Sequence, residues 1–177
     1  NAARDMRMYE LHVANSNATG PTFTERRTFE DLYDPNERIN IDWLNKLGIN
    51  WIWFQPFHPQ GLEGRQTDPA TSTEYDPGSP YSIRNFWEIN PLYTANYDGS
   101  LSDPVANPTN YSAAMTAFQN FASAADGCNV QLILDFPFNH TAPDVVLGQK
   151  GVEIFADSGN PGAWTAGDKI SDRVPQF

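Results

Sequence analysis

Three apolar runs along the chain have the pattern of β-strands. Residues 8–13 alternate between apolar and polar side chains, whereas residues 49–54 and 130–136 are apolar at nearly every position. Alternation is typical of a strand with one solvated face, and a continuous apolar run is typical of a parallel strand buried on both faces. We therefore predict three strands, the second and third of them inside a parallel sheet.

A helix is predicted between the first two strands. Asp34 reads as its N-cap, Pro35 as its first residue and Glu37 as the glutamate of a capping box. Gly48 can end the helix. The apolar residues that then share one helical face are Ile39, Trp43, Leu44 and Leu47.

A second helix is predicted between the second and third strands, ending at Gly127. Its apolar residues at helical spacing are Tyr111, Met115, Phe118, Ala122 and Ala125. The order of elements is then strand, helix, strand, helix, strand. Such βαβ units indicate a parallel sheet with right-handed crossovers.

The connections that leave the carboxyl ends of the strands are long, and those that return are short. The long connections, from a strand to the next helix, cover residues 14–33, residues 55–109 and everything after Phe136. The short connections, from a helix to the next strand, are Gly48 and residues 127–129. Sheets and barrels of this class place their sites at the carboxyl ends of the strands. We expect the functional face there, with a surface insertion of no function as the alternative for the second loop.

Composition narrows the class of ligand. Eleven Lys and Arg against 22 Asp and Glu give a net charge of -11, which argues against a nucleic acid or an anionic membrane as partner. No apolar run reaches the roughly 18 residues of a membrane span. The single cysteine, Cys128, excludes an internal disulfide and a multi-cysteine zinc site. The scarcity of Lys beside Asn, Thr and Ser favours an extracellular or periplasmic protein over a cytoplasmic one.

The third strand ends in an acid, an amide and an imidazole. These are Asp135, Asn139 and His140, in the pattern Asp-x-x-x-Asn-His where the strand opens onto the loop face. The other reading is a hydrogen-bonded aspartate and a packing histidine near a strand end. His58, between Phe57 and Pro59, is interpreted as structural, and His12 as a hydrogen-bonded core residue.

The second long loop combines a Gly-Ser-Pro turn with aromatic and polar side chains over residues 78–91. Aromatic rings stack on the apolar faces of sugars, and sugar hydroxyls need partners such as Asn, Asp, His and Arg, so this composition suits a neutral polyhydroxy ligand. We predict that Tyr81 presents its ring at the loop face, with Phe86 and Trp87 anchoring the segment below. A loop that is merely pinned by these two rings is the alternative, and both readings can hold together.

These residues together resemble the α-amylase (glycoside hydrolase 13) superfamily. Residues 134–140 are similar to its first conserved region, and residues 47–56 are similar to its second barrel strand, which runs into a proline. Residues 80–91 resemble its Gly-Tyr-x-x-x-Asp-Tyr-x-x-Ile-x-Pro segment, and residues 9–13 its first strand. The four matches occur in the family's order.

The resemblance implies a TIM (β/α)₈ barrel that cleaves α-1,4-glucosidic bonds of α-glucans or maltooligosaccharides with retention. Residues 1–141 would be the first three βα units of the catalytic barrel, and residues 142–177 the start of the subdomain B inserted after strand 3. His140 would hydrogen-bond the sugar, Tyr81 would stack under it, and Asp135 would anchor an arginine of the next strand. The resemblance also implies that Asn139 would help to hold a structural Ca²⁺. The segment after Ala142 contains four aspartates that could complete such a site, namely Asp144, Asp157, Asp168 and Asp172.

Two features leave the activity open. Asn85-Phe86 stands where the family has Asp-Tyr, and Gly78-Ser79-Pro80-Tyr81 is closer to maltosyl-transferring members. Asn85 is retained as a substrate-binding candidate. A barrel needs eight βα units, and only three fit in this chain. The resemblance therefore implies that the nucleophile and the general acid lie beyond Phe177 and that this chain contains no catalytic residue. The chain would then be inactive without the rest of the barrel. The alternatives are an α-glucan transglycosylase, a non-catalytic sugar-binding relative and an unrelated α/β protein.

Overall fold

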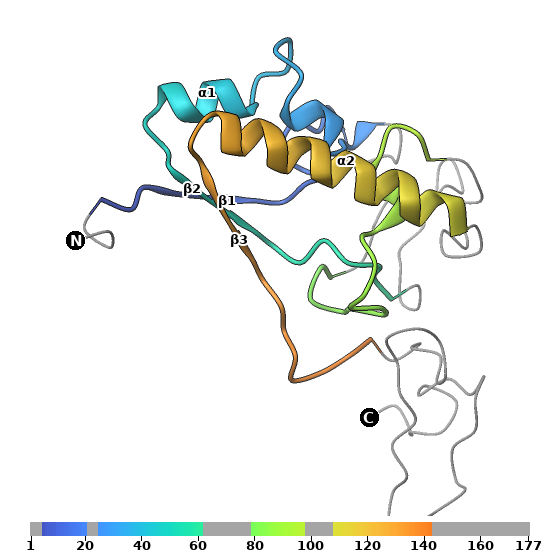
Figure 1. Cartoon of the computed structure of the whole chain (residues 1–177). Coiled ribbons are helices and arrows are strands. Elements are labelled where there is room, and N and C mark those ends of the chain that lie inside the picture. Colours follow the sequence, from blue (N-terminus) through green and yellow to red (C-terminus); the bar gives the residue numbers. More distant parts are fainter. Residues whose placement is uncertain (1–4, 21–24, 62–78, 98–107, 143–177) are drawn as a thin grey trace, which may run out of the picture.

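The computed structural model describes residues 5–20, 25–61, 79–97 and 108–142. The strands are β1 (Met8–Leu11), β2 (Trp51–Phe54) and β3 (Gln131–Leu134). They form one parallel sheet in the order β1-β2-β3 (Figure 1), which confirms the three predicted strands and their direction. The helices are α1 (Ile41–Lys46), α2 (Pro108–Gly127) and two 3₁₀ turns, η3 (Glu30–Leu32) and η4 (Pro91–Tyr93).

One face of the sheet packs against both helices. Side chains alternate between the faces of a strand, and Ile52 and Phe54 of β2 are both 0% exposed on the same face. The ring of Phe54 meets that of Phe121 in α2 with centroids 5.4 Å apart. Because α1 and α2 lie on the same side of the strands (Figure 1), this face forms the core of the described part of the chain.

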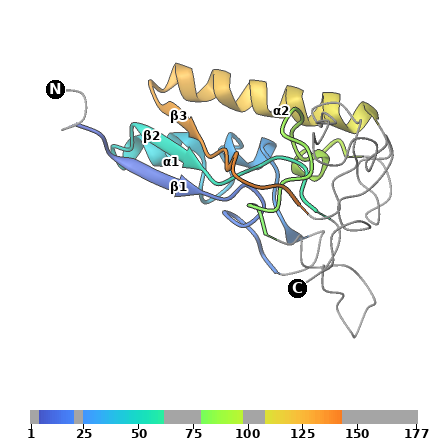
Figure 2. The same cartoon turned by 90° about the horizontal axis from the view of Figure 1, so that it is seen from below.

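No helix of the described residues covers the opposite face of the sheet in the view from below (Figure 2), and this face is called the open face. Trp51, Trp53 and Ile133 are only partly buried there, and Met8 is 40% exposed. The continuous apolar pattern of β2 predicted burial on both faces, but within the described ranges only the helix-covered face is fully buried.

The helix α1 begins at Ile41, so the predicted start at Asp34 is wrong. Asn40 is the N-cap, and its side-chain oxygen accepts from the backbone N–H of Trp43 at 2.8 Å. The carboxylate of Asp34 instead accepts from the N–H of Asn36, two residues on, which closes a local turn. Asp and Asn favour both caps and such turns, so the local pattern did not decide between the two positions.

A contact with a distant segment keeps Ile39 out of helix α1. The side chain of Asn17, which is 8% exposed, accepts from the N–H of Ile39 at 2.9 Å and donates to its carbonyl at 2.7 Å. Both backbone groups of Ile39 are therefore occupied outside a helical ladder. With the helix starting at Ile41, the side chains of Ile41 and Leu44 are buried in the core. Leu47, which the pattern placed on the apolar face, is 55% exposed.

The predicted helix α2 is confirmed, but the residues on its buried face differ in part from the predicted ones. The fully buried positions are Ala114, Ala117, Phe121 and Ala125. Of the predicted face, Tyr111, Met115, Phe118 and Ala122 are half-buried flanks. Three alanines at the centre let the helix approach the sheet closely, so the contact depends on small side chains that a hydrophobicity pattern ranks low.

Phe29 is the centre of the aromatic core. It is 0% exposed, and its ring centroid lies 5.4 to 6.4 Å from five other rings. Those rings belong to Phe54, Phe57, Tyr93, Phe118 and Phe121. The cluster therefore joins β2, η4 and α2 and holds the segment after residue 79 against the sheet.

Candidate functional site at the strand ends

The segment of residues 79–97 lies against the exits of β2 and β3. Gln60 and Ile83 form an isolated antiparallel bridge, and the N–H of Arg84 donates to the carbonyl of Pro59 at 2.8 Å. On the other side, the N–H of Ala142 donates to the carbonyl of Ile83 at 2.7 Å. These backbone bonds bring together three stretches that are far apart in sequence, at the carboxyl ends of the strands.

The anchors of this segment differ from the predicted ones. Trp87 is 64% exposed, so its predicted anchoring role is wrong. Ile83 and Ile89, which are 0% and 3% exposed, anchor the segment instead. Phe86 is half-buried and its ring stacks on that of Phe138, with centroids 5.7 Å apart. The apolar positions of an irregular segment follow no period, and this is why the pattern did not reveal them.

Tyr81 and Asp135 are brought into direct contact. The hydroxyl of Tyr81 donates to Oδ2 of Asp135 at 3.1 Å, across 54 residues of sequence. Loss of solvent around the hydroxyl raises the pKa of Tyr81, and the bond to Asp135 and the charges of Asp135 and Glu10 add to this. The phenol therefore keeps its proton and acts as a fixed donor. The ring remains 36% exposed, so it is available to a ligand.

His140 also contacts the tyrosine segment. Its Nε2 lies 2.9 Å from the carbonyl oxygen of Tyr81, and its Nδ1 lies 2.9 Å from the side-chain oxygen of Asn139. A carbonyl oxygen only accepts, so Nε2 donates to Tyr81. The side chain is exposed. Of the predicted site residues, Tyr81, Asp135 and His140 thus form one connected group.

Asn85 has no described contact with this group. Its side-chain oxygen accepts from the N–H of Trp87 at 2.8 Å, which closes a turn after the tyrosine. The sequence argument missed a further carboxylate, Glu10 in β1, which accepts from the side chain of Gln55 at 2.7 Å. The sequence feature that could have identified Glu10 is its position in the alternating first strand, on the same face of the sheet as Trp53.

The described residues do not form a calcium site. Among residues 5–20, 25–61, 79–97 and 108–142, no group of three or more His, Cys, Asp or Glu side chains could hold a metal ion. The side-chain oxygen of Asn139 faces the His140 ring. The aspartates expected to complete the site lie outside the described residues, namely Asp144, Asp157, Asp168 and Asp172.

The two other histidines are packed among aromatic rings. His12 is half-buried and meets Tyr93 edge-on at 6.2 Å, in line with a packing role, although its Nδ1 finds no hydrogen-bond partner among the described residues. Burial, with the nearby charge of Arg26, lowers the pKa of His12 to about 4. His58 is 5% exposed, and its burial lowers its pKa below the usual 6.5.

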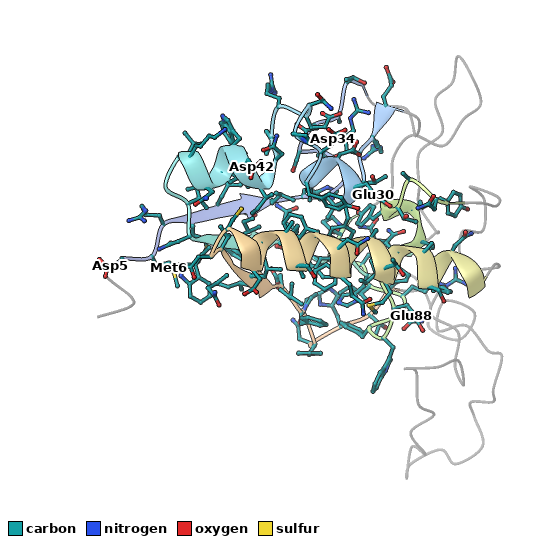
Figure 3. The ribbon with its side chains drawn as sticks, turned by 45° about the horizontal axis from the view of Figure 1, so that its top comes forward. Asp5, Met6, Glu30, Asp34, Asp42 and Glu88 are labelled. Atoms are coloured by element: carbon teal, nitrogen blue, oxygen red, sulfur yellow. The ribbon has the colours of Figure 1, made fainter. Side chains whose placement is uncertain are left out.

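A separate cavity of about 260 Å³ lies beside α1, away from the strand ends. It is lined by Pro35, Glu37, Arg38, Asn40, Asp42, Trp43 and Lys46. In the view of Figure 3, Asp34 and Asp42 lie on one side of α2, and Glu88, next to the strand ends, lies on the other. Within the described ranges, no helix has the length and apolar character needed to cross a membrane.

Comparison with curated proteins finds distant relatives among enzymes that act on α-glucans. The chain is 27% identical over 169 residues to a glycogen debranching enzyme of Pectobacterium atrosepticum, which covers 89% of this chain and 22% of that protein. It is 28% identical over 134 residues to a cyclomaltodextrin glucanotransferase of a Bacillus species, covering 72% of this chain and 16% of that protein. The chain thus spans about a fifth of the length of these relatives. No protein-family model matches the chain.

Comparison with solved structures finds a similar α-amylase. A maltogenic α-amylase of Thermotoga neapolitana superposes on 79% of this chain and 24% of its own, with a TM-score of 0.51 and 25% identity. The three parallel strands therefore match part of an α-amylase structure. Over most of its length, the chain is a distant homologue of the α-amylase (glycoside hydrolase 13) family of enzymes.

Proposed function

We propose that this chain is the amino-terminal part of an enzyme that cleaves α-1,4-glucosidic bonds of α-glucans with retention. Residues 1–141 would supply the first three βα units of a (β/α)₈ barrel, and residues 142–177 would begin the inserted subdomain. The observation that carries the proposal is the group formed by Tyr81, Asp135 and His140 at the carboxyl ends of parallel strands. Barrels of this kind place their sites at that end.

The open face of the sheet supports the barrel. In a (β/α)₈ barrel the helices lie outside and the inner side chains of the strands pack against one another. Trp51, Trp53 and Ile133 lie on the face without helices and are partly exposed. Within the described residues, β1 and β3 each pair on one side only. Further strands would cover these side chains and pair both edges.

Each site residue has a role in this proposal. The ring of Tyr81 stacks on a glucose unit, and His140 and Asn85 hydrogen-bond its hydroxyls. Asp135 holds the Tyr81 hydroxyl and anchors an arginine from the next strand. A carboxylate on a later strand attacks the anomeric carbon, and a second carboxylic acid protonates the leaving oxygen. The covalent glycosyl intermediate then passes to water.

Activity measurements on two proteins test the assignment. The purified 177-residue chain should release no reducing sugar from soluble starch, whereas a longer protein that contains it should do so. In that longer protein, His140→Ala should lower kcat/KM by about 10²-fold or more, as expected for a hydrogen bond that strengthens in the transition state. Turnover by the isolated chain above a heat-killed control contradicts the proposal. Binding without turnover by the longer protein would indicate a non-catalytic relative.

Transfer to a second sugar is the alternative reaction. Ser79-Pro80-Tyr81 is similar to maltosyl-transferring members of the family, and one curated relative is a glucanotransferase. The covalent intermediate would then pass to a sugar hydroxyl in place of water. Incubation of the longer protein with maltotriose separates the two, because transfer yields products longer than the substrate and hydrolysis yields only shorter ones.

A further inference from the structure

His58 is enclosed by rings from three segments. It is 5% exposed and lies four residues after the end of β2. Its ring centroid lies 5.4 Å from that of Phe57, 6.0 Å from that of Phe86 and 4.6 Å from that of Phe136. These rings come from the β2 exit, the segment of residues 79–97 and the β3 exit. The imidazole is therefore at the junction of the stretches that carry the site.

The ring makes one directed hydrogen bond. Its Nδ1 lies 2.8 Å from the carbonyl oxygen of Glu88. Because a carbonyl oxygen only accepts, Nδ1 carries the hydrogen, and the neutral ring has the Nδ1–H tautomer. Burial lowers the pKa of His58, so the ring is neutral near pH 7. His58 is thus a donor of fixed position that points at the backbone of the tyrosine segment.

The carbonyl of Glu88 lies between two backbone hydrogen bonds that tie the segment to the β2 exit. Arg84 and Asn90 are tied through their N–H groups to the carbonyls of Pro59 and Phe57, both at 2.8 Å. Between Arg84 and Asn90, the bond from His58 ties the carbonyl of Glu88 to the β2 exit. Together with the contact of Phe86 with Phe138 and the burial of Ile89, this bond holds the stretch that includes Asn85 and Phe86.

We propose that His58 is a positioning residue for residues 85–88, and through Phe86 and Phe136 for the loop that carries His140. Phe86 and Phe136 both stack on Phe138, with centroids 5.7 and 5.4 Å away. Movement of the 85–88 stretch would therefore displace the residues just before His140. The consequence for sugar binding rests on the function proposed above, whereas the ordering of the segment does not.

Two substitutions separate the hydrogen bond from the packing. In His58→Asn the side-chain amide nitrogen occupies the place of Nδ1, because both atoms are bonded to Cγ. In His58→Gln the amide lies one bond further out, where it mimics Nε2. Both variants lose the ring, so a difference between them reports the bond to Glu88. Leu44→Ala, in α1 and away from the site, shows the effect of general destabilisation.

Hydrogen exchange and sugar affinity are measured on the longer protein that contains this chain. His58→Asn loses the buried ring but keeps the bond, so its exchange at residues 84–90 and its Kd for maltotriose are the reference values for the bond. In His58→Gln, exchange there should be about tenfold faster and the Kd about fivefold weaker, as expected for one lost hydrogen bond. Leu44→Ala should not accelerate hydrogen exchange at residues 84–90 more than elsewhere in the protein.

The outcomes distinguish the two proposals. Equal exchange of residues 84–90 in the Asn and Gln variants overturns the positioning role of His58, even if the native protein binds maltotriose. The expected exchange difference in a protein that binds no maltooligosaccharide supports the positioning role and overturns the proposed function. Equal affinity of both variants, with different exchange, overturns the link from His58 to the sugar.

Discussion

Removing the hydroxyl of Tyr81 tests how the ring is held. The structure shows this hydroxyl donating to Asp135 at 3.1 Å, with the ring 36% exposed. A hydrogen bond to a charged group contributes about 1.5–3 kcal/mol, and competition with water brings a part-exposed one to about 1 kcal/mol. Because the bond is present without ligand, we expect Tyr81→Phe to lower the free energy of unfolding of the longer protein by about 1 kcal/mol. Maltotriose binding should weaken by up to about fivefold, because the sugar then has to order a ring that Asp135 no longer holds.

Tyr81→Ala removes the ring as well. Stacking on the sugar contributes about 0.5–1.5 kcal/mol beyond burial, so the combined loss should approach 2 kcal/mol, about 30-fold in Kd. The Tm should fall much less than for a core residue, since a core aromatic truncated to Ala would cost about 3–5 kcal/mol of the free energy of unfolding. Calorimetric titration and melting curves on both variants give the two quantities. Tyr9→Phe is the matched control, because Tyr9 packs edge-on against Trp43 away from the site.

A double-mutant cycle with Asp135→Asn isolates the bond. If the hydroxyl acts through Asp135, the effects of Tyr81→Phe and Asp135→Asn on affinity should couple by about 0.5–1 kcal/mol. Since the pKa of Tyr81 is raised, its titration should not change the coupling between pH 7 and 9. Additive effects, or a large drop in Tm with normal affinity in Tyr81→Ala, would refute the reasoning.

Three further expectations follow from the fold and from the family resemblance. Phe29→Ala should lower the free energy of unfolding by about 3–5 kcal/mol in denaturant titrations, because five rings surround this side chain, whereas Phe29→Leu should lose much less. The pKa of His12 is about 4 in the folded protein and about 6.5 in an unfolded chain, so stability should be flat above pH 6.5 and fall by about 2–3 kcal/mol towards pH 4; a slope unchanged in His12→Leu would contradict this. If Asn139 helps to hold a structural Ca²⁺, a chelator should lower the Tm of the longer protein and added Ca²⁺ should restore it; a Tm indifferent to the chelator rules the ion out.

The start of α1 shows where local patterns fail. Asp34-Pro35-Asn36-Glu37 satisfies the sequence rules for a helix start, and Asn40 satisfies them too. The choice between them depends on Asn17, which binds both backbone groups of Ile39 from 22 residues away. A local window contains no information on that partner, so the helix and its exposed Leu47 could not be placed correctly from the pattern.

Strand and helix periodicity are properties of the sequence alone, because burial repeats every two residues in a strand and about every 3.6 in a helix. The three strands, their parallel direction and the long helix before the third strand were therefore determined by the sequence. The sequence also identified Tyr81, Asp135 and His140 as candidate site residues, by their type and by their place in family-like motifs. The tertiary structure decided that Tyr81 meets Asp135 and that Ile83 and Ile89, rather than Trp87, anchor the segment. It also decided that His58 bonds to the carbonyl of Glu88 and that, among the described residues, no helix covers the second face of the sheet (Figure 2). These contacts join residues 30 to 59 positions apart through irregular loops, whose paths follow no period and are set by what they pack against.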